Sequence, residues 1–189
     1  MTDLTGVSQG EAGGKEWQPE TTTYLEMLDP SALRPASTGR AGLELRRVER
    51  AEFAIGRTLY IEVGADWLWI DRLAWTDTDW REYYQRPGIE LWIGSVVNDR
   101  AGYFELSSDA EGSTEIAYFG LLPAFIGRGL GGALLTAAIE RAWQNGARRV
   151  WVHTSSRDHA HAFGNYLARG FRIYKTETKP APTRPETGI

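Results

Sequence analysis

The chain has 189 residues, of which 42% are apolar and 24% are charged, so it is long enough for one well-filled core and short for two. Its formal charge of -4 and its pI near 5.5 offer no basic field to a phosphate backbone, which argues against nucleic acid as a partner. The absence of cysteine excludes disulfides, thiolate chemistry and Cys-ligated zinc.

Both ends of the chain are polar and almost without large apolar groups. These segments, residues 1–20 and 179–189, would bury too little apolar surface to offset the conformational entropy lost on ordering. We therefore predict flexible tails around one domain over residues 21–178. The N-terminal residues lack the apolar centre of a signal peptide, and no apolar run approaches the roughly 20 residues of a membrane helix. We therefore expect a soluble, cytoplasmic protein without a membrane partner.

The first half of the domain mixes strand and helix patterns. Residues 21–28 and 43–50 alternate in part and predict strands. Residues 51–63 carry apolar side chains at helical spacing. A second helix is predicted over residues 76–84, because Thr76 is a good N-cap and acidic residues follow it in the first turn.

Three strand-like runs follow, over residues 89–97, 101–108 and 113–122, separated by short turn-forming groups. They predict an antiparallel meander. The period then changes to that of a helix over residues 129–145, which Asn145 and the glycine after it close.

The C-terminal part predicts a strand over residues 148–154, a short helix over 158–169 with Asp158 as its N-cap, and a last strand over 171–177. Strand, helix and strand in this order imply a right-handed crossover between two parallel neighbours. We predict an α/β fold of the α+β kind, a mixed and mostly antiparallel central sheet with one parallel strand-helix-strand core and flanking helices.

The segment FIGRGLGGALL, residues 125–135, places four glycines at the start of the long predicted helix. A helix N-terminus leaves about four backbone N–H groups without partners and carries roughly half a positive charge. Glycine permits positive φ and lets an anion approach without a Cβ in the way. We interpret the segment as a pyrophosphate cradle; the alternative is a tight strand-to-helix turn.

Two common phosphate motifs do not fit this segment. Gly127, Gly129 and Gly132 formally match G-x-G-x-x-G, but no strand leads straight into them and no carboxylate follows about 20 residues later to hold a ribose. A P-loop would require Gly-Lys-Ser or Gly-Lys-Thr, which does not follow. Neither motif explains the glycines.

The window from Ile126 to Gly131 resembles a motif of the GNAT superfamily of acyl-CoA-dependent N-acetyltransferases. That motif reads Gln or Arg, two residues, Gly, one residue, then Gly or Ala. Gly129 and Gly131 match its two small positions, while Ile126 departs from its first position.

A second signature of that superfamily, a helical Tyr followed by Gly-Phe, is present as Tyr166, Gly170 and Phe171. His159 stands where an Asn is common, which is a second departure. The resemblance covers about residues 43–177, and it implies a GNAT-like fold.

The resemblance implies acetyl-CoA as co-substrate and no metal. The strands over residues 114–122 and 148–154 would splay apart to hold the pantetheine. Backbone groups would hold the pantetheine at Phe119, Gly120 and Leu121, and the pyrophosphate at Gly127, Arg128, Gly129, Leu130, Gly131 and Gly132. Arg128 would add charge to a phosphate, or it is a solvated loop arginine.

The implied reaction is direct attack of a primary amine on the thioester. An alkylammonium of pKa about 10.4 must lose a proton, and the departing thiolate must gain one. Tyr166, at the position of the family's usual acid, is the candidate acid; the alternative is a core tyrosine beside Phe163 and Phe171. Glu115 is the candidate base; the alternatives are a solvent-facing strand carboxylate and ordered water as the base.

The acceptor is expected to be a small-molecule or peptide amine. Residues 66–92 hold five of the eight tryptophans among several carboxylates, and such surroundings can bind a cationic amine by cation–π attraction. The alternatives are packing of helices onto the sheet and a homodimer surface. Four residues that are close in sequence have no compelling metal-ligand spacing, and we expect no metal there: His153, Asp158, His159 and His161.

A function from another class stays open, namely an acyl-CoA-binding regulatory or sensor domain without turnover. The departures at Ile126 and His159 favour it. The presence of Tyr166 and Glu115 favours the enzyme.

Overall fold

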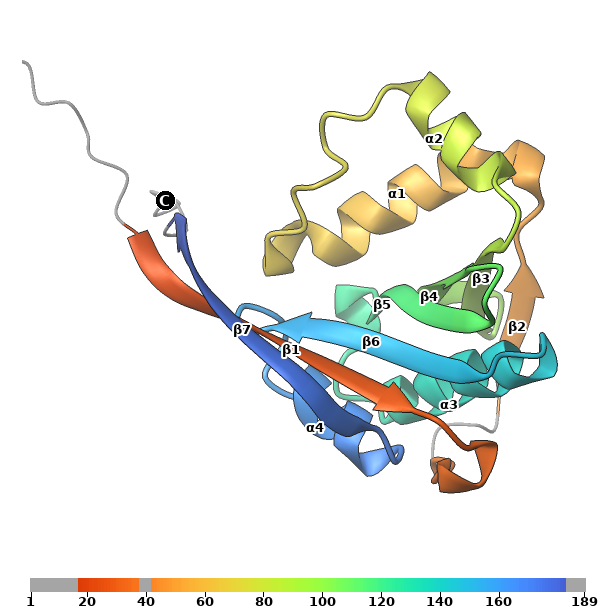
Figure 1. Cartoon of the computed structure of the whole chain (residues 1–189). Helices are drawn as coiled ribbons and strands as arrows, with labels where there is room; N and C mark the ends of the chain where they lie inside the picture. Colours follow the sequence, from red (N-terminus) through yellow and green to blue (C-terminus); the bar gives the residue numbers. More distant parts are fainter. Residues whose placement is uncertain (1–16, 38–41, 183–189) are drawn as a thin grey trace, which may run out of the picture.

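The computed structural model describes residues 17–37 and 42–182, which form one seven-stranded sheet with helices on both faces (Figure 1). The strand order is β2-β3-β4-β5-β6-β1-β7. Every neighbouring pair is antiparallel except β5 and β6, which are parallel. The predicted α+β fold, with its meander and its parallel strand-helix-strand core, is confirmed.

The strands are β1 (Trp17–Met27), β2 (Leu43–Arg47), β3 (Ile89–Val96), β4 (Asp99–Ser108), β5 (Ser113–Leu121), β6 (Arg149–Ser155) and β7 (Arg172–Pro182). The α-helices are α1 (Phe53–Gly64), α2 (Asp77–Gln85), α3 (Leu130–Gln144) and α4 (Ala162–Ala168). In the described part of the chain no helix is long and apolar enough to cross a bilayer.

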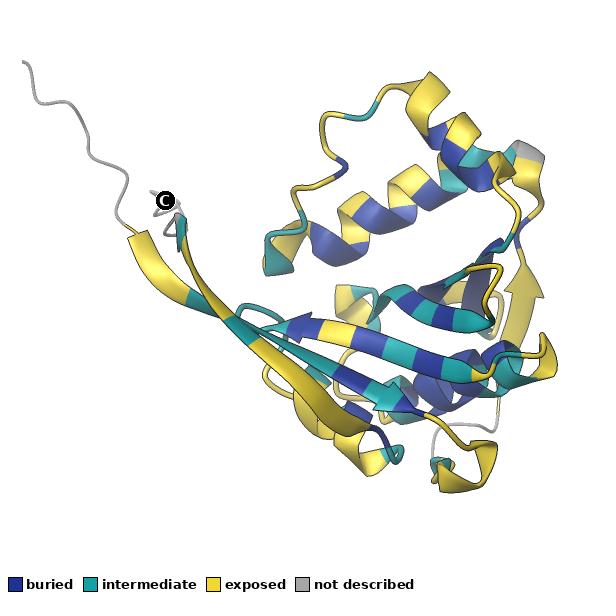
Figure 2. Cartoon of the chain, in the orientation of Figure 1, coloured by how far each residue is buried: buried dark blue, intermediate teal, exposed yellow. Residues whose placement is uncertain are grey.

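Two hydrophobic clusters lie on opposite faces of the sheet, and Figure 2 shows the buried sides of the helices turned toward it. On one face α3 and α4 cover Phe104, Leu106 and Ile116. On the other face α1 and α2 cover a cluster rich in aromatic rings, including Tyr60 and Trp80. Each strand of the meander therefore buries alternate side chains in different cores.

Helix α2 begins as its sequence predicts. The hydroxyl of Thr76 accepts a hydrogen bond from the Asp79 N–H, and the Asp79 carboxylate accepts one from the Thr76 N–H at 2.7 Å. This capping box satisfies two of the amides that a helix start leaves without partners.

Helix α4 begins later than predicted, and the prediction of Asp158 as its N-cap is wrong. The N-cap is His161, and the first helical residue is Ala162. The Asp158 carboxylate instead accepts hydrogen bonds from the Thr154 hydroxyl at 2.7 Å and the Ser155 N–H at 2.8 Å. It thus closes the turn after β6. Asp side chains accept hydrogen bonds from backbone N–H groups in turns as well as at helix N-termini.

The prediction of flexible tails over residues 1–20 and 179–189 is wrong for residues 17–20 and 179–182, which lie in strands. Strand β1 already begins at Trp17 and β7 runs to Pro182, and these two residues are paired in the antiparallel ladder. The polar side chains do not prevent this order, because each strand satisfies the backbone groups of the other. Residues 1–16 and 183–189 lie outside the described part.

Strands β5 and β6 pair only where they begin. Their parallel ladder holds three residue pairs, from Ser113 with Arg149 to Glu115 with Trp151. On its other side β5 pairs with β4 up to Leu121, with a shift of register next to Ala117. The last part of β5 is therefore left without β6 as a partner, and the sheet opens there (Figure 1).

Candidate active site

A cavity of about 1740 Å³ occupies this opening. It is larger than the roughly 300–1,000 Å³ of common small-ligand pockets. Its walls are β5 from Ile116 onward, the end of β6, the start of α3, helix α4 and the segment before α2. A space of this size can hold a large ligand together with a second reactant.

The N-terminus of α3 forms one end of the cavity. Gly127 and Gly129, both cavity-lining, have φ values of 81° and 75°, which favour glycine. A Cβ built at either position meets no atom within 4 Å, and no side chain caps the helix. The amides of the first turn are therefore available to an anion from the cavity.

The other predicted cradle residues have different surroundings. Gly131 and Gly132 also line the cavity, and a Cβ on Gly132 would meet the Arg169 guanidinium, the flexible end of a side chain that can move. Leu130 is buried in the core. Arg128 is exposed, with its guanidinium 4.9 Å from the Phe125 ring, and its side chain is not part of the cavity wall.

The predicted pantetheine-binding residues Phe119, Gly120 and Leu121 lie along the unpaired part of β5 and line the cavity. Phe119 and Leu121 pack against the core under α3. Gly120 faces α1, where a Cβ would collide with Val63. The backbone of this segment is therefore held in place by β4 on one edge and faces the cavity on the other.

Tyr166 of α4 is both a core residue and a cavity residue. Its ring packs edge-on against Phe119 and Phe171, at centroid distances of 6.2 and 6.1 Å, while Phe163 is exposed. Burial, helped by the nearby Asp158 carboxylate, raises the pKa of the Tyr166 phenol well above its ordinary value. The phenol lines the cavity and holds its proton more tightly than a free phenol does.

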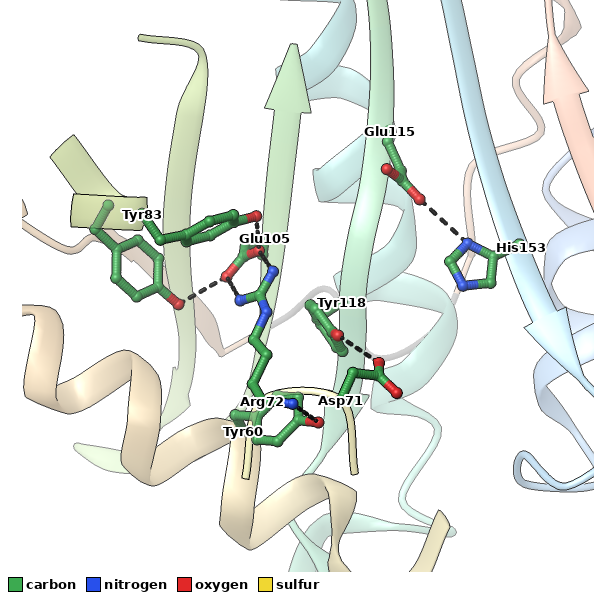
Figure 3. A network of polar contacts seen from close by, with 9 residues as sticks. Tyr60, Asp71, Arg72, Tyr83, Glu105, Glu115, Tyr118 and His153 are labelled. Carbon is green, nitrogen blue, oxygen red and sulfur yellow. Dashed lines mark hydrogen bonds and ion pairs between the residues drawn. The ribbon is translucent and has the colours of Figure 1, made fainter. Parts of the chain in front are cut away.

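Glu115 and His153 meet where β5 and β6 separate (Figure 3). Glu115 Oε1 lies 3.1 Å from His153 Nδ1, and the two side chains are 22% and 46% exposed. The imidazole lines the cavity, whereas the Glu115 side chain lies behind it and outside the cavity wall. The hydrogen bond to this carboxylate raises the pKa of His153 above its ordinary value.

The carboxylate of Glu105 binds Arg72 deep under α2 (Figure 3). The two guanidinium–carboxylate hydrogen bonds are 2.9 and 3.1 Å long, and the hydroxyls of Tyr83 and Tyr84 donate to the same carboxylate at 2.6 and 2.7 Å. Burial lowers the pKa of Arg72 but Glu105 raises it by more, so the guanidinium keeps its charge.

Aromatic rings surround the Arg72 guanidinium, with ring centroids 4.6 Å away for Trp75, 4.1 Å for Tyr83 and 4.3 Å for Tyr118. Trp75, Trp80 and Tyr83 of the aromatic segment over residues 66–92 therefore surround a cation of the protein itself. The predicted packing role is confirmed for these three rings, which pack in the aromatic cluster and are not part of the cavity wall, whereas Tyr118 lines the cavity.

Two tryptophans of that segment do face the cavity. Trp67 and Trp69 line it together with Asp71, whose carboxylate accepts a hydrogen bond from the Tyr118 hydroxyl at 3.0 Å. Trp67 also stands edge-on to His159, at a centroid distance of 5.0 Å. This wall combines apolar surface with a negative charge.

Among the described residues, no group of three or more His, Asp or Glu side chains is placed to hold a metal ion. The rings of His159 and His161 lie 5.1 Å apart, while Asp158 is engaged by the turn after β6. These residues are close in sequence, but in the structure they do not form a set of metal ligands.

Comparison with known proteins agrees with this architecture. The model of the "Acetyltransferase (GNAT) family" matches residues 60–171, more than half of the chain. No curated protein sequence matches significantly.

Several solved structures share the fold. A GCN5-related N-acetyltransferase from Sphaerobacter thermophilus has a TM-score of 0.64 and 17% identity, over 92% of this chain and 55% of its own. One from Kribbella flavida has a TM-score of 0.60 and 19% identity, over 84% of this chain and 56% of its own. An aminoglycoside acetyltransferase from an uncultured soil metagenomic sample has a TM-score of 0.57 and 13% identity, over 68% and 88%.

The chain thus spans little more than half the length of the first two of these structures. The family model and the fold both agree with the geometry of the site. The chain belongs to the GNAT acetyltransferase family.

Proposed function

We propose that the protein is an N-acetyltransferase that moves an acetyl group from acetyl-CoA to a primary amine by direct attack. One observation carries the proposal. The uncapped start of α3, with Gly127 and Gly129 in left-handed conformations, opens onto the cavity between the separated ends of β5 and β6.

The residues present fit acetyl-CoA. The amides at the start of α3 would hold the pyrophosphate, which needs no side chain and therefore tolerates Ile126 in place of Gln or Arg. The backbone of Phe119, Gly120 and Leu121 would pair with the pantetheine amides along the free edge of β5. When bound, acetyl-CoA supplies the acyl group as an activated thioester.

Tyr166 would supply the proton that the departing sulfur needs. Its phenol lines the cavity from α4 and, like an ordinary phenol, is protonated at neutral pH; burial raises its pKa further. A general acid of this kind typically contributes 10²–10⁴-fold to a rate, roughly.

The acceptor would enter from the side of Trp67, Trp69 and Asp71. Aromatic faces attract an ammonium group by roughly 0.5–2 kcal/mol per ring, and a carboxylate adds a favourable charge. The shared fold of an aminoglycoside acetyltransferase makes an aminoglycoside one reasonable acceptor to test beside simple amines.

The experiment measures thiol release from acetyl-CoA, with product mass, over a panel of phenethylamine, spermidine, lysine, sisomicin and a short peptide. Amine-dependent thiol release with an acetylated product supports the transferase. Tight binding of acetyl-CoA without release for any amine would instead identify the acyl-CoA sensor, the function that Ile126 and His159 favour.

A further inference from the structure

His153 is an imidazole at the mouth of the opening between β5 and β6, and the family motifs give it no role. Its side chain is 46% exposed and lines the cavity, and its ring lies 6.2 Å from the ring of Trp151 and 5.9 Å from that of Tyr24 of β1, measured between centroids. Glu115, the base expected from the sequence, is only 22% exposed and lies behind the ring. A substrate in the cavity therefore meets the imidazole before it meets the carboxylate.

The contact between these residues fixes which ring nitrogen is available. Glu115 Oε1 lies 3.1 Å from Nδ1 of His153. An ionised carboxylate only accepts hydrogen bonds, so Nδ1 carries the proton of the neutral ring, and Nε2 keeps the lone pair. Within residues 17–37 and 42–182, no hydrogen bond of the protein to Nε2 competes for that lone pair.

The charges around the ring favour its protonation. Glu115 faces it from β5, Asp158 from the turn after β6 and Asp71 from the segment before α2, and all three raise the pKa of His153. Tyr24 contacts it from β1 as a neutral ring, as a phenol is at neutral pH, and burial raises the pKa of this phenol further. His153 is thus a stronger base than a free imidazole and is flanked by groups that attract an ammonium.

We propose that His153 is the general base that deprotonates the acceptor ammonium through Nε2, and that Glu115 is a positioning residue that fixes its tautomer. The proposal rests on the proposed acetyl transfer and names the group that carries out one step of it.

The protons and bonds balance as follows. Nε2 takes one proton from the ammonium, and the freed lone pair attacks the thioester carbonyl carbon, forming the C–N bond. The C–S bond then breaks, the sulfur takes the phenol proton of Tyr166, and the second amine proton returns to that phenolate. His153 finally releases its proton to water, so an ammonium and a thioester become an amide, a thiol and one proton.

The first test measures the tautomer and the pKa of the His153 imidazole, and it requires no enzyme turnover. In a ¹⁵N-detected titration of the full chain, His153 is assigned by its loss in His153→Gln. We expect the Nδ1–H tautomer with a pKa above that of free imidazole, and a lower pKa in Glu115→Gln. Glu111→Gln, the same change on an exposed turn of the same hairpin, should leave the titration unmoved. An Nε2–H tautomer, or equal pKa values in wild type and Glu115→Gln, would overturn the dyad.

The second test is the pH dependence of kcat with the best amine of the panel. A base acts in its neutral form, so the wild-type rate should rise with pH through the pKa of His153. His153→Gln should lose this limb and about 10²–10⁴-fold of kcat, with acetyl-CoA affinity unchanged. Glu115→Gln should keep the limb, shifted to lower pH, with a smaller loss of rate.

The outcomes separate the two proposals. If His153→Gln keeps the wild-type limb while Glu115→Gln abolishes it, Glu115 is itself the base and our assignment is wrong, although the acetyl transfer stands. If the wild type releases no thiol with any amine while the titration shows the expected tautomer, the transfer itself is refuted, and the assignment of a base for it falls as well.

Discussion

Replacing Gly129 by alanine separates the two roles that this glycine could have. Its φ of 75° is unfavourable for any residue with a Cβ, and the position lines the cavity. Gly146 is a matched control at the other end of α3. It has a φ of 85°, a Cβ there also meets no atom within 4 Å, and it is not part of the cavity wall.

The expected magnitudes differ between stability and binding. A left-handed conformation costs an alanine about 1–2 kcal/mol, so both variants should lose that much free energy of unfolding. Only Gly129→Ala adds a methyl group beside the amides at the start of α3. Loss of one hydrogen bond to a charged group costs about 1.5–3 kcal/mol, which is roughly a 10- to 150-fold weaker affinity for acetyl-CoA.

Denaturant unfolding and calorimetric titration with acetyl-CoA measure the two quantities. We expect equal losses of stability in both variants and weaker binding in Gly129→Ala alone. Equal, unchanged affinities would mean that Gly129 serves only the turn into α3, and the cradle would have to be abandoned.

Three further predictions concern other parts of the molecule. Tyr166→Phe should lower kcat by about 10²–10⁴-fold with little change in acetyl-CoA affinity; an unchanged kcat would remove it as the acid. Arg72→Met leaves Glu105 buried without its cation and should cost about 3–5 kcal/mol of stability, whereas joint replacement by Met and Leu should recover much of the loss; full stability of the single variant in urea would contradict the buried pair. Because the folded state raises the pKa of His153, its contribution to stability is complete below the ordinary value of about 6.5 and is lost as pH rises through the raised value. Unfolding free energies measured across this window should therefore fall with pH less in Glu115→Gln than in wild type, and parallel curves would speak against the contact.

Local signals in the sequence predicted local structure well. The signal for the start of α2 lies within four consecutive positions, from Thr76 to Asp79, and the structure has the capping box there. The same holds for the meander and for α3, where the change of hydrophobic period is read within the segment itself. Asp158 shows the limit of such signals, since an Asp before a short helix can cap it or close the preceding turn.

Contacts between distant segments could not be predicted in this way. Glu115 and His153 are 38 residues apart and meet because β5 and β6 are parallel in one particular register, which no motif specifies. The enclosure of Arg72 by aromatic rings depends in the same way on how α2 lies over β4. The pairing of Trp17 with Pro182 joins two segments whose compositions separately indicate disorder.

The most direct test of the central claim is an amide NMR titration of the full chain with acetyl-CoA. We expect the largest shifts on Gly127, Gly129 and Gly131 at the start of α3 and on Phe119 to Leu121 along β5. Shifts confined to other surfaces, or none at saturating acetyl-CoA, would contradict it.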